Sequence, residues 1–118
     1  MKARKVIIGL GTGLPRDTFE KIFNHLRWSR KQFDYIGIAE ETGKGRPHPD
    51  MILDMLEKCR LQASELLKVG DTVADIQEGK NAKVPTAAIL SGTQSEKDII
   101  SEQPDFIIRH LSELRKIM

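Results

Sequence analysis

Short apolar segments alternate with amphipathic segments along this chain, and this alternation limits its fold more than any other feature. Strands are predicted at residues 6–10, 35–38, 66–69, 85–90 and 106–108. Helices are predicted from Asp17 or Thr18 to Leu26, at residues 49–60, 73–82 and 95–101, and at a closing segment with Leu111, Leu114 and Met118. Turns are predicted at residues 11–15 and 91–93. The pattern predicts an α/β fold with three layers, in which helices cover both faces of a mostly parallel sheet.

The composition places these elements in a single small domain, residues 1–118. The formal charge is only +2, and most of the basic residues are scattered, so no nucleic-acid partner is expected. No apolar run approaches the roughly 20 residues of a membrane span. The N-terminus lacks the apolar core of a signal peptide. We therefore expect a cytoplasmic protein without a membrane partner.

A pair of aspartates after the third predicted strand is the strongest candidate for a functional site. In the segment LKVGDTVAD, Asp71 closes the strand and Asp75 lies in the first turn of the next helix. Both carboxylates can face the crevice in which open α/β sheets bind ligands, and paired carboxylates suit Mg²⁺. The alternative interpretation is that Asp71 or Thr72 only caps the helix and Asp75 only complements its dipole.

Two further loops carry polar groups at predicted strand ends. Thr12 lies before Gly13, and the hydroxyl and backbone N–H groups of this loop could bind a phosphate oxygen, although a plain turn would have the same sequence. In the loop at residues 43–50, Arg46 precedes a proline and could bind phosphate oxygens through its guanidinium group. The alternative for Arg46, and for Lys44 beside it, is an exposed loop charge.

The order of these segments resembles the haloacid dehalogenase (HAD) superfamily of phosphohydrolases. The segments GTGLPRDTFEKIFNHLRW, GKGRPHPDMI and VGDTVADIQEGKNAKVPTAAILSG are most similar to its phosphonatase-like branch. The resemblance implies a Rossmann-like core and a small phosphorylated substrate. It implies that Thr12 hydrogen-bonds the transferring phosphoryl group and that Arg46 stabilises its charge and orients the nucleophile. It also implies that Asp71 and Asp75 hold Mg²⁺, directly or through water.

The sequence departs from the family pattern at the nucleophile. The family uses a DxD motif on its first, central strand, but no two of the eight aspartates here are separated by one residue. The resemblance therefore implies the C-terminal part of a core that lacks the nucleophile strand and the cap, with little or no activity alone and a weakened Mg²⁺ site. The strands ending at Leu10 and Val69 would then either pair directly or, as we favour, assemble with another copy through open edges.

A second function class remains open. A non-catalytic α/β module that binds phosphate or a partner, similar to a receiver domain, would also fit the length and topology. Receivers carry acidic residues after their first strand, whereas this sequence has Gly11, Thr12 and Gly13 at that point.

Overall fold

The computed structural model describes residues 7–26, 33–90 and 94–114, and it confirms the α/β fold class. The strands are β1 (Gly9–Thr12), β2 (Tyr35–Ile38), β3 (Lys68–Gly70), β4 (Thr86–Ile89) and β5 (Phe106–Ile108). The helices are α1 (Arg16–His25), α2 (Ala39–Thr42), α3 (Asp50–Lys58), α4 (Val73–Asn81) and α5 (Glu96–Ser101), with short 3₁₀ turns at Ala63–Glu65 and Leu111–Glu113. None of these helices is long and apolar enough to cross a membrane.

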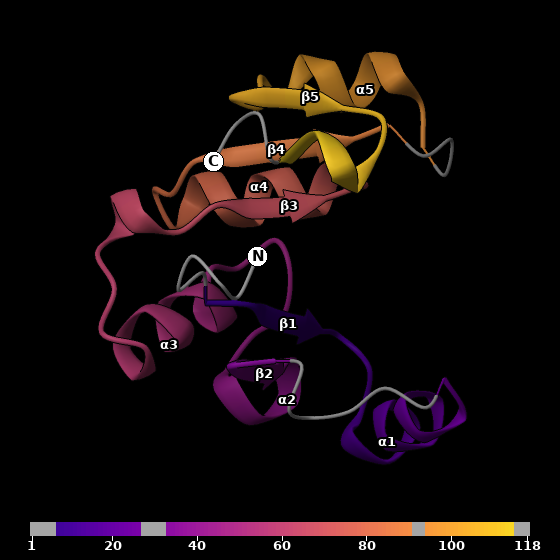
Figure 1. Cartoon of the computed structure of the whole chain (residues 1–118), viewed down its shortest axis with the longest axis vertical. Helices are drawn as coiled ribbons and strands as arrows, with labels where there is room; N and C mark the ends of the chain where they lie inside the picture. The colour runs from indigo at the N-terminus through magenta and orange to yellow at the C-terminus, as the bar shows by residue number, and fades with distance from the viewer. Residues whose placement is uncertain (1–6, 27–32, 91–93, 115–118) are drawn as a thin grey trace.

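The described strands are all parallel but form two separate sheets (Figure 1). β1 pairs with β2, while β3, β4 and β5 form the second sheet in that order. Within the described residues, β1 and β3 do not pair with each other, so the direct pairing considered from the sequence is not the arrangement found. The predicted single sheet is therefore split between β1 and β3.

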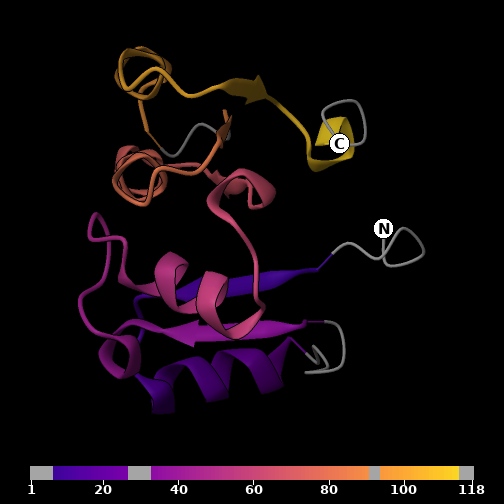
Figure 2. The ribbon, with the colours of Figure 1, turned by 90° about the vertical axis from the view of Figure 1, so that its left-hand side faces the viewer.

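Helices cover both faces of the β1–β2 sheet. On one face, Phe19 and Phe23 of α1 pack against Ile38 of β2, and Figure 2 shows α1 beneath these strands. On the opposite face α3 approaches so closely that a Cβ atom built at Gly9 would lie 2.5 Å from Sδ of Met55. A side chain at this position would force the end of the Met55 side chain to move.

The second sheet is covered on one face by α4 and α5. Ile76 of α4 and Ile99 of α5 are buried with Ala88 of β4 in one cluster. A different cluster joins the halves of the chain, because Ile52 of α3 packs with Leu66, just before β3. The two sheets thus share a core although their strands do not pair.

The first strand lies further along the chain than the sequence predicted. The prediction began at residue 6, which lies outside the described residues, and ended at Leu10. The structure places Gly11 and Thr12 within β1, with Thr12 opposite Ile38 in the register with β2. Gly11 does not break the strand, because it pairs with Gly37 of β2.

The start of the predicted C-terminal helix lies within the described residues. The structure has a 3₁₀ turn at Leu111–Glu113 followed by a helical residue, Leu114, while Met118 and the predicted turn at 91–93 lie outside the described residues. Leu111 is exposed. The one-turn helix α2 was not predicted.

Candidate functional site

The turn between β3 and α4 brings Thr72 and Asp75 together. The Thr72 hydroxyl accepts a hydrogen bond from the backbone N–H of Asp75 at 3.1 Å, and Asp75 Oδ2 accepts one from the N–H of Thr72 at 3.2 Å. This reciprocal pair is a capping box. A Cβ atom at Gly70 would overlap Cβ of Asp75, so only glycine allows this approach. Thr72 is thus the capping residue of α4, as one interpretation of the sequence had it, and Asp75 takes part in the cap as well.

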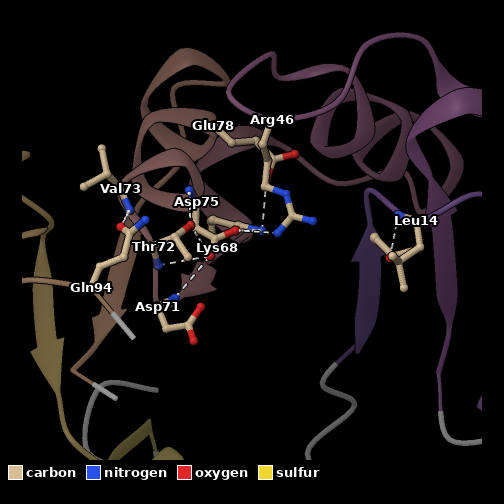
Figure 3. A network of polar contacts seen from close by, with 10 residues as sticks. Leu14, Arg46, Lys68, Asp71, Thr72, Val73, Asp75, Glu78 and Gln94 are labelled. Carbon is tan, nitrogen blue, oxygen red and sulfur yellow. Dashed lines mark hydrogen bonds and ion pairs between the residues drawn. The ribbon is translucent and has the colours of Figure 1, made fainter. Parts of the chain in front are cut away.

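Asp75 also forms an ion pair with Arg46, which lies in the loop between α2 and α3. Arg46 Nη1 donates to Asp75 Oδ1 at 2.7 Å. The Asp75 side chain is only 5% exposed and that of Arg46 is 28% exposed, so the pair is partly shielded from water. Asp75 therefore has a second role beyond capping, because it holds the arginine at the carboxyl end of β3 (Figure 3).

The surroundings of Asp75 stabilise its charged form. Burial alone raises the pKa of this carboxyl group, but the hydrogen bond from Arg46 and the nearby charge of Lys68 lower it. The hydrogen bond from Thr72 also lowers it, and the net pKa of Asp75 lies below its ordinary value. The Asp75 carboxylate is accordingly charged at neutral pH.

Lys68 and Glu78 extend this network, and the sequence analysis did not select either of them. Lys68 Nζ lies 3.6 Å from Asp75 Oδ1 and 2.9 Å from Glu78 Oε1. The Glu78 side chain is 1% exposed, and the neighbouring cation neutralises it. Two signals were present in the sequence: a lone cation inside an apolar strand, and an acidic residue three positions after Asp75 on one helix face.

Asp71 lies beside Asp75 but its side chain points elsewhere. Its backbone N–H donates to Asp75 Oδ2 at 3.2 Å, while its carboxylate points away from Asp75 (Figure 3). Among the residues the structure describes, no group of three or more His, Cys, Asp or Glu side chains could hold a metal ion. The donor set therefore fits Mg²⁺ only in part. Both oxygens of Asp75 already accept hydrogen bonds from protein groups.

The loop after β1 approaches the same arginine. A Cβ atom built at Gly13 would lie 3.7 Å from Nη2 of Arg46. Thr12 is half-buried, and its hydroxyl accepts a hydrogen bond from the backbone N–H of Leu14 at 3.1 Å. Arg46 thus lies between the Thr12–Gly13 loop and Asp75. Lys44, the other cation considered in its loop, is exposed.

A groove of about 890 Å³ separates the two sheets and reaches this cluster. Arg46, Asp71 and Asp75 line it, and the Met51 and Met55 side chains of α3 contribute an apolar part of its wall. Polar groups gathered beside an apolar cavity are typical of a ligand site.

Known proteins with similar sequences belong to the family that the sequence motifs resemble. Residues 1–89 match the family model of the haloacid dehalogenase-like hydrolases. A phosphonoacetaldehyde hydrolase of Bacteroides fragilis is 33% identical over 94 residues, which cover 79% of this chain and 36% of that protein. A phosphonoacetaldehyde hydrolase of Bacillus mycoides is 28% identical over 104 residues, which cover 87% of this chain and 39% of that protein.

Solved structures show the same fold. A phosphonoacetaldehyde hydrolase-like protein from Oleispira antarctica superposes with a TM-score of 0.82 at 18% identity, over 98% of this chain and 51% of that one. A HAD hydrolase from Bacillus subtilis, solved bound to magnesium, gives 0.77 at 25% identity over 97% of this chain and 48% of that one. The chain belongs to the haloacid dehalogenase-like hydrolase family, in its phosphonatase-like branch, and spans well under half the length of the two hydrolases matched by sequence.

Proposed function

We propose that this chain provides the phosphate- and Mg²⁺-binding part of a phosphatase- or phosphonatase-like active site. The observation that carries the proposal is the position of Arg46, which contacts Asp75 through Nη1 while Nη2 lies beside Gly13. The ligand is a small molecule with a phosphoryl or phosphonyl group. The phosphonoacetaldehyde hydrolases among the relatives support this substrate class.

Arg46 and the Thr12–Gly13 loop would hold the phosphoryl oxygens. A guanidinium group presents five N–H donors, and the contact with Asp75 uses only a donor on Nη1. The other donors can reach oxygens placed between Arg46 and Gly13. Thr12 can rotate its hydroxyl hydrogen toward the same oxygens. This arrangement would stabilise the negative charge that develops on the phosphoryl oxygens during transfer.

Asp71 and Asp75 have different roles in this proposal. Asp71 would hold the metal ion, whereas Asp75 positions Arg46 and the backbone of the turn and would act on the metal through water. Mg²⁺, when bound, would neutralise charge on the phosphoryl oxygens. The chain's own contribution is to fix the carboxylate of Asp71 and the guanidinium of Arg46 at one edge of the fold.

The nucleophile is not among the residues of this site. Nucleophilic catalysis at phosphorus by a carboxylate requires that carboxylate in line with the leaving group. The sequence contains no DxD motif, and Asp71 and Asp75 are assigned to other roles. We therefore expect ligand binding by this chain but little turnover, unless a carboxylate comes from elsewhere.

The runner-up function is a module that binds phosphate or a partner without any catalytic role, as receiver-like domains do. The lack of a DxD motif in the sequence favours it. Supplying a suitable carboxylate distinguishes the two functions, because only a hydrolase site would then release phosphate.

Turnover and binding measured on one preparation test the proposal. The 118-residue chain should hydrolyse a phosphate monoester no faster than its Asp71→Ala variant, yet bind inorganic phosphate in the presence of Mg²⁺. Asp98→Ala, which alters an exposed aspartate of α5, is the matched control and should bind as the unaltered chain does. Mg²⁺-dependent turnover well above that of Asp71→Ala would contradict the expectation that this chain lacks a nucleophile.

A further inference from the structure

The loop that carries Arg46, residues 43–49, is bonded to α4 at a second point. Nδ2 of Asn81, the last residue of α4, donates a hydrogen bond to the carbonyl oxygen of Pro47 at 2.7 Å. Pro47 directly follows Arg46 in the chain, so this bond holds the backbone next to the arginine. The loop is therefore bound to α4 through its backbone as well as through the guanidinium group.

The two contacts lie at opposite ends of α4. Asp75, Glu78 and Asn81 are spaced by three residues and form one row along the helix. Asp75 accepts from Arg46 in the first turn, and Asn81 donates to Pro47 at the last residue. The six residue steps between them correspond to about 9 Å along the helix axis. Two contacts this far apart restrain the loop against rotation about either one.

The hydrogen bonds inside the loop set its shape but not its distance from α4. The N–H of His48 donates to the carbonyl of Gly45 at 3.0 Å. The N–H of Lys44 donates to Oδ2 of Asp50, the first residue of α3, at 2.7 Å. The placement of the loop against α4 depends on contacts with α4 itself, and the bond from Asn81 is one of them.

The position of this backbone matters because the Arg46 side chain makes two contacts at its far end. Nη1 lies 2.7 Å from Oδ1 of Asp75, and Nη2 lies 3.7 Å from a Cβ atom built at Gly13. A shift of the loop away from α4 would stretch the arginine or release Asp75. Donors that are already in place when a ligand arrives save the cost of ordering them.

We propose that Asn81 is a positioning residue for Arg46, which it holds in the phosphate-binding orientation through the carbonyl group of Pro47. Asn81 does not touch the ligand. The inference deepens the proposed function and rests on it for the effect on phosphate affinity. Asn81 is uncharged and exposed, so replacing it changes neither the charge of the site nor the core.

The position of Arg46 can be tested without any ligand. Phenylglyoxal modifies accessible guanidinium groups, and mass spectrometry gives the rate of modification at each arginine. Asn81→Ala should raise the rate at Arg46 about threefold relative to the exposed Arg109, because the loop no longer holds the guanidinium against Asp75. Gln77→Ala, which shortens another amide side chain of α4, is the matched control and should leave this ratio unchanged. Circular dichroism of each variant establishes that it is folded.

Phosphate affinity tests whether the position of Arg46 has a functional effect. In the presence of Mg²⁺, Asn81→Ala should weaken the binding of inorganic phosphate about fivefold, and Gln77→Ala should not change it. The same Asn81→Ala substitution in an Arg46→Met chain, measured at correspondingly higher phosphate concentration, should have no further effect. A residue that only stabilises the fold would not show this dependence on Arg46.

Two results would overturn the proposal. One is an unchanged rate of modification at Arg46 in Asn81→Ala. The other is an equal loss of phosphate affinity with and without Arg46, because Asn81 would then act independently of the arginine. A raised rate at Arg46, together with equal phosphate affinities of Arg46→Met and the unaltered chain, would uphold the positioning by Asn81 and contradict the proposed function instead.

Discussion

Nη1 of Arg46 lies 2.7 Å from Oδ1 of Asp75. Arg46 belongs to the loop that follows β2 and α2, whereas Asp75 lies in the first turn of α4, directly after β3. The pair is therefore a polar link between the two sheets, which share part of a core but whose described strands do not pair with each other. Because Asp75 also caps α4, one buried carboxylate sets both the start of the helix and the position of the arginine. A substitution at Asp75 should therefore disturb both features at once.

Asp75→Asn should lower the free energy of unfolding by about 1–3 kcal/mol. The substitution keeps the shape but removes the charge that pairs with Arg46 and Lys68. Denaturation in urea, followed by circular dichroism, measures the change. Asp98→Asn on the exposed side of α5 is the control and should stay within about 0.5 kcal/mol. Equal stability of the two variants would mean that the ion pair contributes nothing.

The contribution of Asp75 should depend on pH in a defined direction. Its pKa in the folded chain lies below the ordinary value, which is about 3.9 in an unfolded chain. A lowered pKa stabilises the fold above that ordinary value, and the stabilisation is lost as pH falls through the folded pKa. The difference in unfolding midpoint between the unaltered chain and Asp75→Asn should thus be constant from pH 7 to 5 and shrink below about pH 4. A difference that grows on acidification would contradict the assigned sign.

Gly70→Ala should destabilise the chain by about 2 kcal/mol or more, because the new methyl group would overlap Asp75. Gly13→Ala is a matched control, since its methyl group would meet only Nη2 of Arg46 at an ordinary distance of 3.7 Å. Thermal unfolding of the two variants compares them directly. A smaller loss for Gly70→Ala than for Gly13→Ala would show that the turn adjusts without cost.

Lys68→Met should be among the most damaging single substitutions of a partly exposed residue. It leaves the carboxylate of Glu78 buried without its cation, and such a change costs about 3–5 kcal/mol. The double variant Lys68→Met/Glu78→Leu removes both charges and should recover part of this loss. If the double variant is less stable than Lys68→Met, the pair does not act as a unit.

Local patterns in the sequence predicted much of the fold. The strand Tyr35–Ile38 has the bounds expected from its apolar run, and α4 begins where its capping residues predicted. The end of β1 was misplaced because glycine normally weakens a strand, whereas here Gly11 pairs with Gly37 of β2. Pairing between strands, which the local pattern does not contain, decided the outcome there.

Only those residues of the candidate site that follow a predicted strand end could be found from the sequence. Asp71 and Asp75 follow a strand end, a position that can be found from the sequence. The roles of Lys68 and Glu78 depend on a contact between a strand and the helix that covers it, and local sequence patterns do not contain the register of that contact. The closeness of Arg46 to Gly13 likewise arises from how two distant loops fold back on the same edge.

Binding of inorganic phosphate in the presence of Mg²⁺ tests the central claim most directly, with the unaltered chain, Arg46→Met and Arg46→Lys compared by calorimetry. Arg109→Met, which removes an exposed arginine paired with Glu96, is the control for a lost positive charge. Spectra of each variant before titration establish that it is folded. We predict at least tenfold weaker binding for Arg46→Met, intermediate binding for Arg46→Lys and no change for Arg109→Met. Equal affinities of folded Arg46→Met and Arg109→Met would contradict the account, because phosphate would then bind without the arginine that Asp75 holds in place.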